Sequence, residues 1–173
     1  MVAPDEKGAR DVRQGHWVLL SYRLPREPSS PRIAIWRKLK RLGVAQLGDG
    51  LVALPADART REHLDWIAEE IVEAGGTAGM WLARPATLAQ ERDLARTMAA
   101  ARATEYEAVV AEAEGTGELT GAERRRLLRR LRGELRRIQR RDYFPPPQRH
   151  AAEAAVARLR VADDTERTEE RTA

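Results

Sequence analysis

The sequence predicts an α+β fold, in which a four-stranded antiparallel sheet is followed by a helical extension. Three observations carry this prediction. Apolar runs and amphipathic stretches alternate in the order strand, helix, strand, strand, helix, strand over residues 16–84. A glycine-aspartate-glycine turn joins the two middle strands, and only helical patterns follow residue 87. The order matches the ferredoxin-like, or split βαβ, plan, in which two helices cover one face of the sheet.

The first half of this domain begins with a buried strand. Residues 16–24 are rich in Trp, Val, Leu and Tyr, as buried strands are, and the prolines that follow them end the strand. Ser30 is expected to be the N-cap of the next helix, with Pro31 at its first position, where no amide donor is needed. Gly43 is expected to end this helix in the left-handed conformation.

The second half of the domain follows a hairpin. Asp49 and Gly50 suit a tight two-residue turn between two short strands. Thr60 is expected to cap the second helix, whose apolar residues recur at helical spacing, and residues 77–83 form the last strand. All four tryptophans of the chain lie in this domain, and each is expected to be a core or core-edge residue: Trp17, Trp36, Trp66 and Trp81.

The remaining sequence predicts a helical extension over residues 87–161. Capping boxes at Thr87 and Thr120 mark the starts of two helices, because each threonine is followed three residues later by Gln or Glu. A glycine-rich break separates these helices, which gives a helical hairpin. One more short helix is expected at 149–161.

The two ends of the chain are expected to be disordered. Residues 1–15 have no apolar period, and residues 162–173 are mostly polar and acidic. The predicted organisation is therefore a disordered arm, a ferredoxin-like domain at 16–84, the helical extension and a disordered acidic tail.

Composition and charge indicate a water-soluble protein. The 173 residues are 42% hydrophobic and 34% charged, and the formal net charge is +4. The chain has no cysteine, which excludes disulfides, zinc-thiolate sites and thiol catalysis. Neither a signal peptide nor an apolar span of about 18 residues is recognisable. A cytoplasmic location without a membrane partner is therefore expected.

No catalytic or metal-binding constellation stands out. The three histidines are scattered without metal-ligand spacing, and no glycine-rich loop lies between a strand and a helix. The strand-helix-hairpin layout is similar to that of the small CRISPR-adaptation nucleases. In that family an aspartate near the end of the first strand holds a metal, whereas this chain has Ser21-Tyr22-Arg23-Leu24 there. We therefore expect no enzyme activity, no metal and no cofactor.

The sharpest candidate site is an arginine-rich helix near the carboxyl end. At about 100° per residue, its leucines and Ile138 share one face, and arginines occupy the opposite face. Such a row could follow a nucleic-acid backbone by neutralising its phosphates. In the alternative, the arginines pair with acids of the preceding helix, such as Glu105, Glu107, Glu112 and Glu114. The residues expected to contact phosphates are Arg125, Arg129, Arg132, Arg136 and Arg140.

A second candidate site lies at the start of the helix at 31–42. Free backbone amides and the helix dipole favour anions at such a position. An oxyanion such as chromate or sulfate, or a DNA phosphate, is therefore a candidate ligand. The alternative is ordinary capping beside a solvated basic face. The residues expected to form the site are Ser29, Ser30, Arg32 and Arg37.

Four groups of residues along the chain form a recognisable pattern. They are Ser21-Tyr22 with Leu24-Pro25, Ser29-Ser30-Pro31-Arg32 with Trp36-Arg37, Leu54-Pro55, and Asp142-Tyr143-Phe144. Together they resemble the N-terminal domain of the ChrB-type chromate-resistance proteins, over roughly residues 16–160. Members of that family are associated with chromate-inducible regulation of resistance operons. The resemblance therefore implies a regulatory, DNA-associated role.

The predicted function is thus a non-enzymatic, DNA-associated regulator that contacts the phosphate backbone and forms a homodimer. Two alternatives stay open. One is a homodimeric protein–protein interaction module that uses the sheet edge or the helical hairpin. The other is an oxyanion sensor without direct DNA contact. DNA binding through phosphates predicts an affinity that falls steeply with salt, whereas an oxyanion sensor gains thermal stability with chromate or sulfate.

Overall fold

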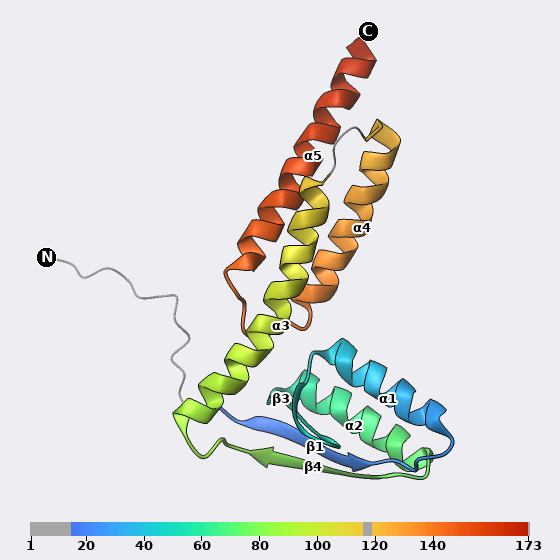
Figure 1. Ribbon diagram of the computed structural model, residues 1–173, viewed down its shortest axis with the longest axis vertical. Coiled ribbons are helices and arrows are strands. Elements are labelled where there is room, and N and C mark those ends of the chain that lie inside the picture. Colours follow the sequence, from blue (N-terminus) through green and yellow to red (C-terminus); the bar gives the residue numbers. More distant parts are fainter. Residues whose placement is uncertain (1–14, 116–118, 173) are drawn as a thin grey trace, which may run out of the picture. The chain divides into compact units, whose positions relative to one another are not determined.

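The chain folds into two compact units, and the boundary between them lies between Ala95 and Arg96. The computed structural model describes residues 15–115 and 119–172, with side chains described as far as residue 161. The disordered arm predicted at 1–15 lies, apart from its last residue, outside the described residues. Figure 1 follows the chain through both units.

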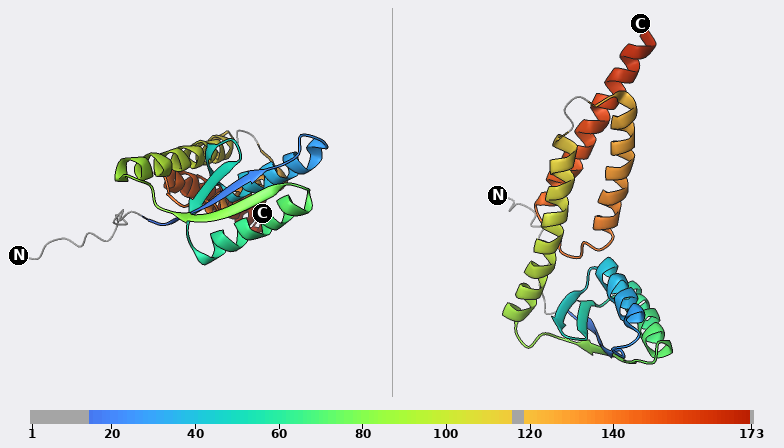
Figure 2. Two further views of the ribbon diagram at one scale, coloured as in Figure 1. Left: turned by 90° about the horizontal axis from the view of Figure 1, so that it is seen from below. Right: turned by 45° about the vertical axis from the view of Figure 1, so that its right-hand side comes forward.

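The first unit contains a four-stranded antiparallel sheet, so the α+β class is confirmed. The strand order is β2-β3-β1-β4, and each neighbouring pair is antiparallel. Two helices, α1 and α2, lie on one side of this sheet (Figures 1 and 2). The bounds are β1 Trp17–Arg23, α1 Ser29–Leu42, β2 Ala45–Gly48, β3 Leu51–Pro55, α2 Ala58–Glu73 and β4 Thr77–Ala83.

The core of this unit follows from alternation along the two central strands. Val18 lies opposite Leu54 and Leu20 opposite Val52, and all four side chains are buried. Because alternate residues of a strand share a face, these four side chains lie on one face of the sheet. Burying such a side chain contributes about 1.5–3 kcal/mol. The helices complete this core with Ile35, Leu39, Leu64, Ile67 and Ile71.

Both predicted helix starts in this unit are wrong by a few residues. The N-cap of α1 is Pro28, which makes no side-chain cap hydrogen bond, and Ser30 is already helical. Pro31 is tolerated inside the first turn because the first four amides of a helix have no intrahelical partner. The N-cap of α2 is Asp57, whose side chain accepts from the Thr60 amide at 2.7 Å. Thr60 returns the bond as an acceptor from the Asp57 amide at 3.0 Å, so it closes the capping box.

The predicted turns are confirmed. Gly43 ends α1 with a φ of 72°, in the left-handed region. Gly50 has a φ of 68° in the turn between β2 and β3, and its carbonyl accepts from the Tyr22 amide at 2.7 Å. A Cβ atom at Gly50 would collide with the Tyr22 carbonyl oxygen, so this position needs glycine for space as well as for conformation.

The prediction that every tryptophan belongs to the core or its edge is wrong for two of them. Trp17 is buried and Trp36 is half-buried, as expected. Trp66 is 54% exposed, because α2 buries Leu64 and directs Trp66 about 200° away from it. Trp81 is 63% exposed on β4, at the edge of the sheet.

The second unit is helical. It contains α3 (Leu88–Glu114) from Arg96 onward, α4 (Gly121–Gln139) and α5 (Gln148–Thr172), which Figure 2 shows side by side. The predicted capping box at the start of α4 is present. The last helix does not end near residue 161 but continues to Thr172, since no glycine or proline interrupts the sequence there. No helix in the described part of the chain has the length and apolarity needed to cross a membrane.

Candidate nucleic-acid interface

Helix α4 is amphipathic in the predicted sense. Leu128, Leu131 and Ile138 are buried in the apolar cluster of the second unit, and Leu127 and Leu135 pack against that cluster. The cluster also includes Tyr106, Val109, Ala113, Ala152, Ala155, Val156 and Leu159 from the other two helices. Because one face of α4 is fixed against this cluster, the opposite face is directed outward.

Four of the predicted arginines form a continuous row on that outward face, which we call the arginine stripe. Their spacing of three, four and four residues keeps them within about 80° around the helix axis. All are exposed except the half-buried Arg132. Among the described residues, none of the four side chains has a hydrogen bond or an ion pair. The arginine stripe consists of Arg129, Arg132, Arg136 and Arg140.

Arg125, the fifth predicted residue, differs from the stripe. It is half-buried and has an interaction with other groups of the chain. It lies at the start of α4, one turn before Arg129, and is not included in the stripe.

Three arginines beside the stripe are neutralised by acids. Arg130 forms a two-point ion pair with Glu112 of α3, and Arg137 pairs with Glu134. Arg141 donates to Glu105 at 3.0 Å. The hydrogen bond from Arg130 lowers the pKa of the Glu112 carboxyl, and the same bond raises the pKa of the Arg130 guanidinium. The positive charges of these three arginines are therefore compensated, and those along the stripe are not.

The structure thus supports only part of the alternative, in which acids of α3 pair with the arginines of α4. Glu112 and Glu105 do bind arginines of α4, but not those of the stripe. Glu107 accepts from Gln148, and Glu114 accepts from Arg158 at 2.8 Å.

A polar cluster behind α4 was not predicted. The Tyr106 hydroxyl donates to Asp142 at 2.8 Å, and the Asp142 side chain is fully buried. Burial, reinforced by this hydrogen bond, raises the pKa of Tyr106 above its ordinary value. Arg149 donates to Glu153 at 3.0 Å and lies 3.9 Å from Asp142. The bond between Tyr106 and Asp142 therefore joins α3 to the segment that connects α4 and α5. Tyr143, the next residue of that segment, is half-buried.

The oxyanion site predicted at the start of α1 is not assembled around one point. Ser29, Ser30, Arg32 and Arg37 are all exposed. Arg37 lies about 7.5 Å along the helix from Arg32 and about 140° around it, so the two guanidinium groups are directed to different sides. A hollow beside this helix start is lined by Glu70, which pairs with Lys38, and by Glu73, whose charge opposes an oxyanion. Chromate or sulfate binding at this place stays a prediction.

No metal site is found among the residues that the structure describes. No group of three or more His, Asp or Glu side chains there has the arrangement to hold a metal ion. His16 accepts from Arg84 at 3.0 Å, and the ring of His63 lies edge-on to Trp66. These two histidines therefore have ordinary surface contacts.

Comparison with known proteins places this chain in a single protein family. Residues 32–171 match the family described as Protein ChrB, N-terminal, and the chain belongs to this family. It is 31% identical over 133 residues to Protein ChrB of Cupriavidus metallidurans, an alignment that covers 75% of this chain and 40% of that protein. The chain therefore spans less than half of the relative's length. No solved structure matches it significantly.

Proposed function

We propose that this chain is a non-enzymatic regulatory protein that associates with DNA through the arginine stripe of α4. The observation that carries the proposal is the division of charge on this helix. Acids neutralise Arg130, Arg137 and Arg141, and the stripe beside them has no partner among the described residues. Like charges three or four residues apart destabilise a helix by a few tenths of a kcal/mol per pair. An anionic partner would remove that cost.

The dimensions of the stripe suit a polyanion. From Arg129 to Arg140 the helix rises about 17 Å, at about 1.5 Å per residue. Duplex DNA carries one phosphate charge per about 1.7 Å of its axis, so a duplex segment as long as the stripe has about ten charges, about five on each strand. Guanidinium groups bind phosphates at two points, and such contacts fix position without selecting sequence. We therefore assign affinity, and not base recognition, to these residues.

Membership in the ChrB N-terminal family supports the same proposal. We infer a cytoplasmic role in chromate-inducible regulation, which is what the family resemblance implies. Because the chain spans 40% of the curated relative, that role includes whatever the rest of such a protein contributes.

The fold of the first unit also supports a finer assignment, the ferredoxin-like plan. Strand β1 lies between β3 and β4, and the hairpin strand β2 lies at the far edge. Each helix therefore connects two strands that have a third strand between them, as the split βαβ plan requires.

The test is the salt dependence of binding to a duplex of mixed sequence. The logarithm of the binding constant is expected to fall with the logarithm of salt concentration, with a slope of about −0.9 per phosphate contact. The double variant Arg132→Gln, Arg136→Gln removes two contacts, so the slope becomes shallower by about two.

A matched control removes the same charge from arginines that already have partners. Arg130 and Arg158 are exposed and bind Glu112 and Glu114. The variant Arg130→Gln, Arg158→Gln should weaken binding less and leave the slope nearly unchanged. Equal slopes for the two variants, or no measurable binding by the natural protein at low salt, would refute the proposal.

A further inference from the structure

The two edges of the sheet are built differently. Edge strand β2 has four residues, and a register shift interrupts its pairing with β3, which hinders the addition of another strand. Edge strand β4 has seven residues, Thr77–Ala83, without a charge or a proline. Natural sheets protect long edges with charges, prolines or bulges, so an unprotected edge is a candidate for pairing with another chain.

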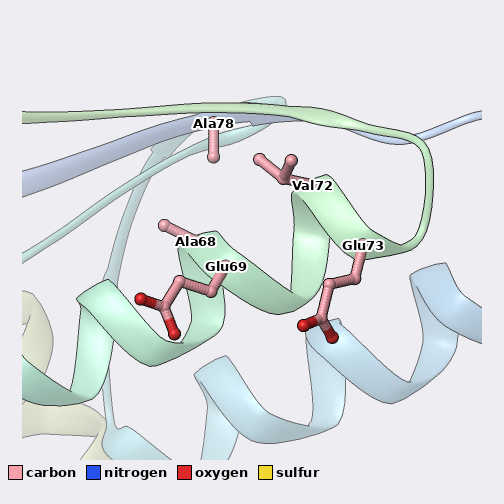
Figure 3. A pocket seen from close by; sticks show the side chains of 5 residues that line it. All are labelled: Ala68, Glu69, Val72, Glu73 and Ala78. Carbon is pink, nitrogen blue, oxygen red and sulfur yellow. The ribbon is translucent and has the colours of Figure 1, made fainter.

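Edge strand β4 exposes two large apolar side chains, Trp81 and Leu82. Leu82 is 58% exposed, and Val72 of the adjacent helix α2 is 57% exposed. Next to them is an open hollow of about 420 Å³ between α2 and β4. In Figure 3, Ala68 and Val72 point from α2 toward Ala78 of β4. The acidic residues Glu69 and Glu73 complete the lining of this hollow.

We propose that β4 pairs with β4 of a second copy of this chain, in antiparallel orientation and centred on Met80. This register uses the whole strand, because Met80 is the middle residue of the seven. It places Leu82 opposite Ala78 of the second copy and Trp81 opposite Gly79 of the second copy. Directly opposite residues point to the same face of a sheet. The two sheets thus become one continuous sheet, with the helices of both copies on the same face.

In this dimer the hollow between α2 and β4, which is lined in part by apolar side chains, holds an apolar side chain of the second copy. Ala78 faces α2, so Leu82 of the second copy, opposite it, enters the hollow beside Ala68 and Val72. By the two-fold symmetry the same contact forms twice. Both exposed apolar groups, Leu82 and Val72, become buried in one step.

Charge complementarity supports a second copy as the occupant. Arg84 lies two residues beyond Leu82 and so projects from the same face. In the proposed register it lies over the end of the second copy's α2, where Glu69 and Glu73 line the hollow. In the proposed dimer, the positive Arg84 of each copy therefore lies near acidic residues of the other copy.

The opposite face of the pairing is also complementary. The Trp81 ring lies over Gly79 of its own strand and donates from Nε1 to the Ser21 hydroxyl at 3.2 Å. In the proposed register each indole has Gly79 of the second copy as its direct neighbour. The missing side chain at that position leaves room for the large ring.

The first experiment measures the mass of the full chain in solution across a range of concentrations. The natural chain should reach twice 19.4 kDa. Leu82→Glu places a carboxylate opposite Glu69 and Glu73, and should raise the dissociation constant of the dimer by at least about tenfold. The control Trp66→Glu changes another exposed side chain of the same unit, on the outer side of α2, and should leave the mass unchanged.

The second experiment tests the register. The chain has no cysteine, so Met80→Cys introduces a single thiol. Opposite residues of antiparallel strands have Cα atoms about 4.5–5.5 Å apart, which is within disulfide range. Mild oxidation should therefore link Met80→Cys into a covalent dimer, whereas Trp66→Cys should stay monomeric.

A mass of 19.4 kDa at every concentration would overturn the proposal. So would a dimer that Leu82→Glu leaves intact, or a Met80→Cys variant that dimerises without forming the disulfide. Circular dichroism of each variant verifies that the fold is retained. DNA binding is a separate measurement, and its failure would leave the mass result unaffected.

Discussion

Arg130 of α4 donates to Glu112 of α3 at 2.8 Å in a two-point ion pair, although both side chains are about half exposed. An exposed pair of this kind stabilises a protein by about 0–1 kcal/mol. Its larger consequence is electrostatic, because Arg130 lies next to the arginine stripe and Glu112 cancels its charge.

Removal of that acid should therefore strengthen DNA binding. Glu112→Gln removes the negative charge that neutralises the Arg130 guanidinium and makes this charge available to a phosphate, so the affinity should rise and the salt slope should steepen by about one. The free energy of unfolding should change by less than about 1 kcal/mol. Binding titrations at several salt concentrations measure the first effect, and urea unfolding measures the second.

The matched control for this prediction is Glu107→Gln. Glu107 is on the same helix but binds the neutral Gln148, so the substitution changes net charge equally without freeing an arginine. If both variants gain the same affinity, net charge alone explains the effect, and the local neutralisation of Arg130 is irrelevant to binding.

Gly133 lies inside α4 between two members of the stripe, and its substitution should stabilise the helix. A Cβ atom at this position meets nothing within 4 Å, so Gly133→Ala introduces no clash. Alanine is favoured over glycine in a helix by about 0.5–1 kcal/mol. The midpoint of thermal unfolding should rise by about 2–4 °C per kcal/mol in a chain of this size.

Gly50→Ala is the opposite case and serves as the comparison. Its left-handed conformation and its close approach to the Tyr22 carbonyl both oppose a side chain, so this variant should lose stability. A loss of stability in Gly133→Ala as well would mean that the helix face at residue 133 is less open than its surroundings indicate.

Stability at alkaline pH should depend on Tyr106. Burial, the hydrogen bond to Asp142 and the charge of Asp142 raise the pKa of Tyr106 in the folded protein. In the unfolded chain a tyrosine has a pKa of about 10. The unfolded chain therefore releases this proton first. The stabilisation is complete below pH 10 and decreases as the pH rises above it, by at most about 1.4 kcal/mol per pH unit.

The variant Tyr106→Phe measures this contribution. It removes the donor to a fully buried carboxylate and should lower the free energy of unfolding by about 1–3 kcal/mol at neutral pH. Its stability should then fall less steeply above pH 10 than that of the natural protein. Burial also raises the pKa of Tyr22, so part of the alkaline decline should persist in the variant. Urea unfolding between pH 8 and 11 measures the stability of both proteins. If the free energy of unfolding fell equally with pH in the natural protein and in Tyr106→Phe, Tyr106 would not be the source of the alkaline decline.

Features set by local chemistry could be predicted from the sequence. Gly43 and Gly50 adopt positive φ because a helix end and a tight turn require it, and Thr120 caps α4 through a residue three positions away. The buried and outward faces of α4 followed from its helical period. The start of α1 was predicted two residues too late, because proline is compatible with more than one position in the first turn of a helix.

Features set by tertiary register could not be predicted in the same way. The acids available to Arg130 and Arg141 lie on α3, and the sequence does not fix which residues of two helices lie opposite each other. The burial of Asp142 beside Tyr106 depends on that same alignment. The exposure of Trp81 depends on its strand being at an edge, which is a property of the whole sheet.

Glu91 at the start of α3 is such a tertiary feature, and its removal should destabilise the sheet unit. Its carboxylate is buried and accepts from the Trp17 indole at 3.2 Å and from the Gly15 amide at 2.8 Å, both through Oε1. Glu91→Ala removes the acceptor that a buried indole N–H uses, which costs about 1–3 kcal/mol. Glu91→Gln keeps a carbonyl oxygen for the same donors and removes a buried charge, so it should retain most of the stability. Urea unfolding of the two variants tests this order, and a glutamine variant as unstable as the alanine variant would show that the negative charge, and not the acceptor, stabilises this position.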